Sequence, residues 1–364
     1  MVLLETSIDK TWFLTGTISF ELGVTVNSTT VEDSPLIFST EETFNELNDS
    51  FNELGFTKNE VTNIFNFKLF ILLLGNLNKV EELMELEEFS KESELNFDIK
   101  LLNNYLDVNV IKTGLDEIRS KRTKKEFINS RDTVAQNLYL LLFNYIVKKI
   151  NMTIESECDS YIGILDIFGF EVFKNNGFEQ LCINYTNERL QNIFNKYIFE
   201  LEQEEYKREN IDWEDINFES NKKIIELIDN KKNSIFSYQI EQSILGSGND
   251  NFFYQSLKNN LIENNYFDIE NKHIVKKKFM IKHYAGEVVY NSNNYIEKNR
   301  NTLDKRFNEF IKSGDGIITE FDTSIFSFVT KKIKNKNIIA ELKNQLDNLL
   351  NEISKQNQFY IRCI

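Results

Sequence analysis

Cysteine and histidine are both scarce in this chain. Its 364 residues contain three cysteines and two histidines. Because Cys158, Cys182 and Cys363 lie far apart without the paired spacing of a metal site, a disulfide scaffold and a zinc protein are both poor interpretations, and a reducing, cytosolic compartment is favoured. No pattern of acids or cysteines accompanies His283, so the sequence predicts an inward-packed histidine there and not a metal ligand.

Long apolar runs and an excess of positive charge are missing as well. The longest apolar run, 69–74, is too short to span a bilayer, and the N-terminus lacks the basic region and apolar core of a signal peptide. A net charge of −15 argues against a general nucleic-acid binder. Any polyanionic partner must therefore meet a local basic patch.

The hydrophobic content indicates a folded protein of more than one compact unit. Hydrophobic residues make up 41% of the chain and aromatic residues 13%, which is enough to build a large core in a chain of this length.

Residues 161–171 are the most informative stretch. An apolar run of strand length ends in Asp166, and Gly169 and Glu171 follow, which is typical of a buried strand that delivers functional groups at its carboxyl end. Asp166 could hold Mg²⁺ directly or through water, Gly169 could bring its N–H close to a phosphate, and Glu171 could pair with an arginine. The alternative is an ordinary glycine turn with two solvated acids.

A long amphipathic helical pattern follows from Phe178 to Glu209. A helix of about thirty residues is roughly 45 Å long, so it could carry a small displacement over a large distance.

These two stretches together resemble a known family. Residues 166–171, Asp-Ile-Phe-Gly-Phe-Glu, resemble the switch II motif of myosin motor domains, and residues 184–206 resemble their relay helix. The resemblance implies a mostly helical α/β fold, a fragment of the myosin motor fold in which only part of the phosphate-loop NTPase-like central sheet is present, with strands at 160–168 and 359–364. It covers roughly residues 41–364.

The resemblance also implies roles for individual residues. Asp166, Gly169 and Glu171 would be the catalytic switch residues that sense the γ-phosphate, with Asp166 and Gly169 at the nucleotide and Asp166 near Mg²⁺, through water. The relay residues would be Asn184, Glu188, Phe194 and Trp213. For Trp213 alone, a packed surface aromatic is the alternative.

Contacts with filamentous actin are expected at three basic or polar places. Residues 124–130 resemble an actin-facing loop before a helix, 250–267 resembles a helix-loop-helix that docks on actin, and 313–337 resembles the flexible basic loop 2. The candidate residues are Lys124, Lys125, Lys258, Asn259, Asn260, Lys331, Lys332, Lys334 and Lys336. A solvated turn is the alternative for the first place and an ordinary amphipathic hairpin for the second.

Local patterns predict further elements. Thr57 and Glu60 form a capping box for a core helix over 58–74, after a helix that ends at Gly55. Ser130 or Asp132 is expected to cap a helix with an apolar stripe from Val134 to Ile146. Other expected elements are strands over 12–26, short helices over 101–119, helices over 224–228, 235–245 and 339–353, and a strand pair over 278–290 that bends at Gly286.

The resemblance divides the chain into five parts. We expect an upper 50-kDa-like helical subdomain over 1–155, the switch II strand, relay helix and relay loop over 156–215, a lower 50-kDa-like actin-binding subdomain over 216–312, a loop 2-like linker over 313–337, and a helix and central-sheet strand over 338–364.

The sequence contains no Gly-x-x-x-x-Gly-Lys-Ser/Thr phosphate loop, and no counterpart of switch I, the converter or the lever is found. Since phosphoryl transfer depends on the phosphate loop and its lysine, we expect no ATP hydrolysis by this chain alone. The sequence therefore predicts part of a cytoplasmic, cytoskeletal motor that uses actin, ATP and Mg²⁺ when complete, without nucleic acid or a membrane span. The alternatives are a non-catalytic actin-binding remnant or regulatory module, and a helical scaffold.

Overall fold

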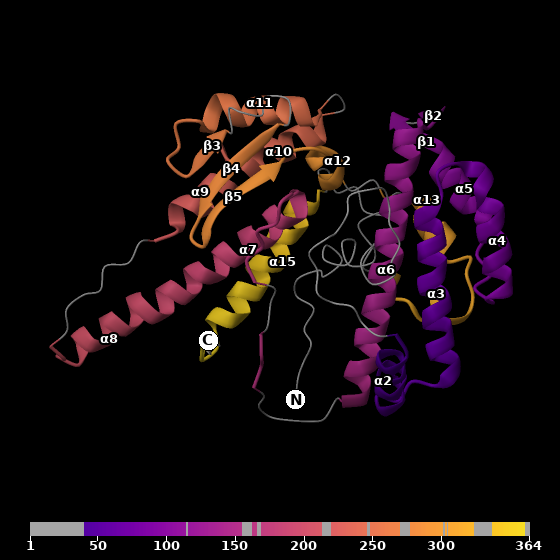
Figure 1. Ribbon diagram of the computed structural model, residues 1–364, viewed down its shortest axis with the longest axis horizontal. Helices are drawn as coiled ribbons and strands as arrows, with labels where there is room; N and C mark the ends of the chain where they lie inside the picture. The colour runs from indigo at the N-terminus through magenta and orange to yellow at the C-terminus, as the bar shows by residue number, and fades with distance from the viewer. Residues whose placement is uncertain are drawn as a thin grey trace. The chain divides into compact units, whose positions relative to one another are not determined.

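The computed structural model describes residues 40–113, 116–154, 162–165, 169–212, 220–245, 248–269, 277–300, 303, 305–323 and 337–360 (Figure 1). These residues form two compact units, one from 40–164 and 303–323, the other from 165–300 and 337–360. Both are mostly helical, as expected, and each contains one small antiparallel sheet. No helix in the described ranges is long and apolar enough to cross a bilayer.

The first unit is a helical bundle with one hairpin. Its elements are α2 (Thr40–Glu53), α3 (Lys58–Asn76), η1 (Val80–Glu82), α4 (Leu83–Glu92), α5 (Ile99–Asp107), β1 (Val108–Thr113), β2 (Asp116–Lys121), α6 (Lys124–Ile154), α13 (Lys305–Ile311) and η4 (Gly316–Glu320). The predicted capping box at α3 is confirmed, because the Thr57 side chain accepts from the Glu60 N–H at 3.3 Å and the Glu60 carboxylate accepts from the Thr57 N–H at 2.7 Å.

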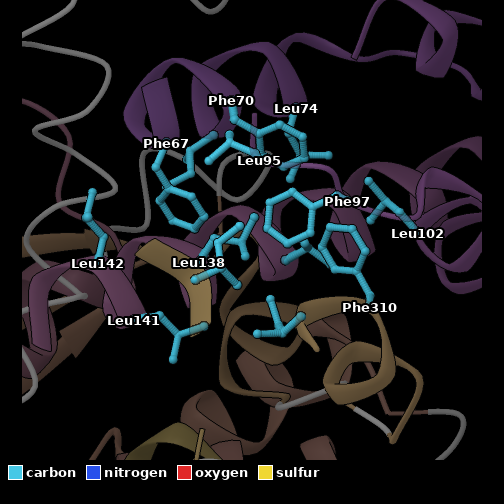
Figure 2. Close-up of a cluster of buried hydrophobic side chains, with 14 of the residues drawn as sticks. Phe67, Phe70, Leu74, Leu95, Phe97, Leu102, Leu138, Leu141, Leu142 and Phe310 are labelled. Atoms are coloured by element: carbon cyan, nitrogen blue, oxygen red, sulfur yellow. The ribbon is translucent and has the colours of Figure 1, made fainter. Parts of the chain in front are cut away.

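Aromatic rings fill the core of the first unit. Figure 2 shows Phe67 and Phe70 of α3 pointing toward Phe97 and Phe310, with leucines of α6 beside them. Phe97 stacks on Phe310 with a centroid separation of 4.6 Å and lies 4.8 Å from Phe70. Leu138 and the four phenylalanines are all buried. This non-polar packing accounts for the stability of the unit through the hydrophobic effect.

Two sequence predictions in the first unit were wrong, one of them only in part. Of the short helices expected over 101–119, residues 101–107 are helical and lie in α5, but 108–113 and 116–121 pair as antiparallel strands, because β-branched residues such as Val108 and Val110 favour extended backbone. The helix expected to begin at Ser130 or Asp132 begins at Lys124, where Thr123 and Glu126 form another capping box. Residues 124–130 are therefore helical and not a loop.

The segment after α13 also differs from its prediction. Residues 313–323 were expected to begin a flexible linker, but Ile317, Ile318 and Phe321 are buried in the first unit. The Phe321 ring lies 5.0 Å from that of Phe67. Burying these apolar side chains lowers the free energy of the folded chain relative to a loop in which they are exposed to water. Helix α13 also lies in the first unit, whereas the sequence placed residues 305–311 in a lower subdomain over 216–312.

The second unit is built on a long helix, whose first part, α7, packs against α9, α15 and β5. Its elements are α7 (Phe178–Asn195), η2 (Lys196–Leu201), α8 (Glu202–Arg208), α9 (Lys222–Asp229), α10 (Ile235–Ile244), α11 (Asp250–Leu261), β3 (Phe267–Ile269), β4 (Lys278–His283), β5 (Gly286–Asn291), α12 (Tyr295–Asn299) and α15 (Ile338–Ser354). The predicted long helix is confirmed over 178–208, and η2 is a π-helical segment within it. Figure 1 shows α7 and α8 continuing along one line.

The sheet of the second unit is antiparallel in the order β3-β4-β5. The predicted strand pair around Gly286 is confirmed. On the buried face, Phe279 stacks on Phe267 at 5.9 Å and on Tyr290 at 5.5 Å. Residues 250–267 are not a helix-loop-helix, because β3 begins at Phe267 and pairs with β4.

The two strands expected in a central sheet are not formed by the residues that the structure describes. Residues 162–165 and 359–360 are irregular, and the side chains of Ile162, Ile164 and Phe359 are exposed. An apolar run becomes a strand when neighbouring strands accept and donate its backbone hydrogen bonds, and no described segment does so here. The strands predicted over 12–26 lie outside the described residues.

Candidate functional site

The segment before the long helix is held by one side chain of that helix. The Glu171 N–H donates to Asn184 Oδ1 at 2.8 Å, and Asn184 Nδ2 donates to the Glu171 carbonyl oxygen at 2.8 Å. Asn184 is fully buried. Because the amide uses both its donor and its acceptor on one backbone unit, it fixes the position of Glu171 relative to α7.

Asn184 belongs to a buried set of polar side chains that we call the polar hub: Asn184, Glu188, Asn221, His283 and Tyr290. Asn184 Nδ2 lies 2.8 Å from the Tyr290 hydroxyl, which lies 2.9 Å from His283 Nε2. His283 Nδ1 lies 3.0 Å from Glu188 Oε1. The prediction of an inward-packed His283 is confirmed.

The hydrogen bonds of the polar hub can be ordered in one direction. An ionised Glu188 only accepts, so His283 donates from Nδ1 and, when neutral, accepts at Nε2 from the Tyr290 hydroxyl. Burial raises the pKa of Tyr290, which keeps that hydroxyl protonated. The Tyr290 oxygen then accepts from Asn184, whose own oxygen accepts from the Glu171 N–H. Each bond polarises the next toward the Glu188 carboxylate.

Two further donors converge on Glu188. The Tyr284 N–H donates to Oε1 at 3.0 Å, and Asn221 Nδ2 donates to Oε2 at 2.6 Å and to the Glu188 carbonyl oxygen at 2.8 Å. Asn192 in turn donates to Asn221 Oδ1 at 3.0 Å. The carboxylate therefore connects α7 to the β4–β5 turn and to the start of α9, with both of its oxygens satisfied.

Local structure explains why these side chains meet. Asn184 and Glu188 are four residues apart and lie on one face of α7. Alternation along β4 and β5 puts His283 and Tyr290 on the same buried face of the sheet. The sequence distance between Glu188 and His283 is 95 residues, so only the fold brings them together.

Residues 169–171, which precede the long helix, are called the switch-like segment here. The side chains of Phe170 and Glu171 are only partly buried. Burial raises the pKa of Glu171, while the hydrogen bond from Gln180 Nε2, at 3.4 Å, opposes that change. Among the described residues, no lysine or arginine forms an ion pair with Glu171, so its expected arginine partner is not found there. The Phe170 ring packs edge-on against His283 at 4.9 Å and so joins the segment to the polar hub.

The described residues do not complete a nucleotide or magnesium site. Asp166 and Trp213 lie outside them. Gly169 is exposed, and a Cβ added to it would meet nothing within 4 Å, so no close backbone cradle surrounds it. In the part of the chain that the structure describes, no group of three or more acidic, histidine or cysteine side chains could hold a metal ion.

The structure divides the remaining candidates between the two units. Lys124 and Lys125 are exposed in the first turn of α6, in the first unit. Residues 258–260 are exposed at the end of α11, in the second unit. The relay candidate Phe194 packs edge-on against Tyr360 at 4.9 Å. The four candidates in 331–336 lie outside the described residues.

Tyr290 and Asn221 are hub residues that the sequence did not single out. A signal existed for Tyr290, since alternation along the strand buries it and a buried hydroxyl needs a partner. No local pattern indicates Asn221, whose partners lie on another helix.

Comparison with known proteins gives a consistent result. A sequence model of the myosin head (motor domain) family matches residues 24–364, beginning earlier than the expected residue 41. The chain is 34% identical to Myosin-4 of Arabidopsis thaliana over 338 residues, which is 88% of this chain and 30% of that protein.

Two other relatives are similarly distant. The chain is 31% identical to Myosin-1 of Saccharomyces cerevisiae over 351 residues, covering 89% of this chain and 18% of that protein. It is 31% identical to Unconventional myosin-Id of Danio rerio over 344 residues, which is 88% of this chain and 34% of that protein. The chain thus spans about a third or less of the length of these relatives.

Proposed function

Because the chain belongs to the myosin head (motor domain) family, we propose that it is part of an actin-based, ATP-driven motor of the cytoskeleton. Residues 166–171 act in this proposal as switch II, and the helix that begins at Phe178 acts as the relay helix. ATP and Mg²⁺ belong to the complete motor, and filamentous actin is its partner. The five sequence-defined parts described above keep their proposed roles, apart from the changes in 305–323.

The observation that carries the proposal is the pairing of the Glu171 backbone with Asn184. A shift of residues 169–171 must either break two hydrogen bonds of 2.8 Å or move Asn184, and with it α7. Breaking them would leave the buried Asn184 Oδ1 without a partner, which costs about 1–3 kcal/mol. Keeping both bonds requires α7, together with the hairpin bonded to it through the polar hub, to move with the segment, so α7 is suited to follow the segment before it.

The proposed actin contacts are electrostatic. Lys124, Lys125, Lys258 and the lysines of 331–336 provide local positive charge on a chain whose net charge is −15. Steering of this kind weakens as salt is added, because the Debye length falls to about 3 Å at 1 M.

The chain alone is proposed to be inactive as an ATPase. Asp166, Gly169 and Glu171 would supply two acids and one backbone N–H, and the sequence contains no phosphate loop or phosphate-loop lysine. A phosphate-loop coding segment upstream in the same gene would favour the motor over a non-catalytic actin-binding module.

The test is co-sedimentation of the purified chain with filamentous actin across a salt series, with mant-ATP binding and phosphate release followed in the same samples. We expect pelleting that weakens with salt and no measurable turnover. Lys258→Glu should weaken pelleting by about threefold or more, while Lys232→Glu, at an exposed lysine outside the proposed contacts, should not. Absence of pelleting at low salt would contradict the actin contacts, and ATP turnover would contradict the inactivity of the chain.

A further inference from the structure

A second cluster of polar side chains joins three helices of the second unit. The Tyr185 hydroxyl donates to Asp229 Oδ2 at 2.5 Å, and Lys343 Nζ pairs with the other oxygen of Asp229. Arg189 Nη1 donates to the Tyr185 hydroxyl at 2.8 Å, and Arg189 Nη2 donates to Asp347 Oδ1 at 2.7 Å. We call these five residues of α7, α9 and α15 the charge chain.

The charge chain is buried at one end and open at the other. Tyr185 is fully buried, and the Asp229 side chain is 8% exposed, whereas the Asp347 side chain is 50% exposed. Burial, and then the charge of Asp229, raise the pKa of Tyr185, so its hydroxyl stays protonated and donates to the carboxylate. The buried end therefore depends on each partner being present, while Asp347 can be changed without leaving a charge in an apolar core.

The opposite charges of Lys343 and Asp347 on α15 fit only one alignment of α15 along α7. Lys343 and Asp347 are four residues apart on α15. Lys343 pairs with Asp229, which is bonded to Tyr185 of α7, and Asp347 pairs with Arg189, four residues after Tyr185 on the same helix. Sliding α15 by one turn, about 5.4 Å, would bring Asp347 toward Asp229. Sliding it the other way would bring Lys343 toward Arg189. Both alternative registers place like charges together, so they are disfavoured.

We propose that the charge chain locks α15 in one register against α7, so that the two helices move as one rigid body. A second contact supports this beyond the end of α15, where the Tyr360 ring packs against Phe194 at 4.9 Å and Tyr197 at 5.7 Å. Residues 185–197 of the long helix are thus contacted at one end by α15 and at the other end by Tyr360, which follows α15 in the chain. In the motor proposed above, on which this consequence rests, a displacement of α7 carries α15 with it.

The test is hydrogen exchange followed by mass spectrometry on the full chain, without actin or nucleotide. Asp347→Arg places two cations together and is expected to speed exchange of the α15 amides, and of α7 from Tyr185 onward, by about tenfold. The β4–β5 hairpin should not change. The control is Glu352→Lys, which reverses an exposed charge on the same helix, away from the charge chain.

The second variant, Asp347→Asn, decides the matter, because it weakens the pair with Arg189 without placing two cations together and leaves the bond from Arg189 to Tyr185 in place. Faster exchange of the α15 amides in Asp347→Asn than in Glu352→Lys supports the lock, including the case in which Asp347→Arg does not fold. Exchange in Asp347→Asn that is no faster than in Glu352→Lys overturns it. None of these readouts depends on actin binding, so a failure of the lock is distinct from a failure of the proposed function.

Discussion

The two units of this chain are held together in different ways. The first unit buries a cluster of aromatic rings in which Phe97 contacts Phe70 and Phe310. The second unit also has an aromatic sheet face, but it buries the polar hub against α7, with Asn184 and Glu188 fully enclosed. Apolar contacts depend mainly on volume, whereas hydrogen bonds depend on particular atoms at particular angles.

This difference corresponds to the proposed roles of the units. Directional bonds define one position of α7 relative to the β4–β5 hairpin and the switch-like segment, and they tolerate little displacement without breaking. A helix that reports the position of residues 169–171 needs such a definite reference. In the first unit, the buried Arg131 and Arg306 donate to backbone carbonyl oxygens, and its described residues form no buried network of side chains as extended as the polar hub.

The first way to test the comparison is to remove volume from the aromatic core. Phe97→Ala should lower the free energy of unfolding of the first unit by about 3–5 kcal/mol, because the ring contacts are lost and a cavity remains. Hydrogen exchange in increasing urea separates the two units, with α3 and α6 reporting on the first. The control is Met84→Ala, in the same unit at a side chain that is 78% exposed, and it should change the free energy of unfolding by at most about 0.5 kcal/mol. Equal losses in the two variants would contradict the prediction.

The next test removes the acceptor at the centre of the polar hub. Glu188→Ala leaves His283, the Tyr284 N–H and Asn221 without their carboxylate partner, so we expect a loss of about 3 kcal/mol in the second unit. Hydrogen exchange of the α7 and β4 amides measures this loss of stability. The control Glu226→Ala, at an exposed position on α9, should be nearly neutral. A nearly neutral Glu188→Ala would mean that the polar hub does not stabilise the unit.

Sequence alone predicted those elements whose signals are local. The capping box of Thr57 and Glu60, the helix after Phe178 and the strand pair at Gly286 each depend on residues close together in the chain, and all three are confirmed. The start of α6 was missed although its signal is equally local, since Thr123 and Glu126 form the same kind of capping box.

The arrangement of the site depends on tertiary structure that local patterns do not contain. Asn184 and Glu188 were identified through the family resemblance, but their partners Tyr290 and His283 lie 106 and 95 residues away. Periodicity indicates which strand residues face inward and gives no information about which helix they meet. For the same reason, the apolar run at 162–165 predicted a strand although no described segment pairs with it.

A smaller effect is expected from one hydroxyl of the polar hub. Tyr290→Phe removes the group between Asn184 and His283 and should cost the second unit about 1–2 kcal/mol. The ¹⁵N shifts of the His283 ring should also change, because Nε2 loses its donor. The control is Tyr254→Phe, a buried tyrosine of the same unit whose hydroxyl has no side-chain hydrogen-bond partner among the described residues. If both substitutions cost the same, the hydroxyl has no special role in the hub.

The smallest effect is expected from a polar contact at the edge of the first unit. Burial acts to raise the pKa of Glu60, but Lys149 and the N–H and hydroxyl of Thr57 lower it from 4.5 to about 2. A lowered carboxyl pKa gives stability that is present above pH 4.5 and is lost as pH falls toward about 2. Glu60→Gln should therefore cost about 1 kcal/mol near pH 7, by urea unfolding, and the two proteins should converge as the pH is lowered.

The matched control is Glu126→Gln at the capping box of α6. The pKa of Glu126 is lowered by hydrogen bonds from Thr123, against an opposing effect of burial, and none of the described lysines forms an ion pair with it. Its substitution should thus cost less than that of Glu60. A loss at Glu60 as large as that expected for Glu188, or a difference that widens toward acid pH, would make a polar group a main determinant of the first unit, and the contrast between the two units would fail.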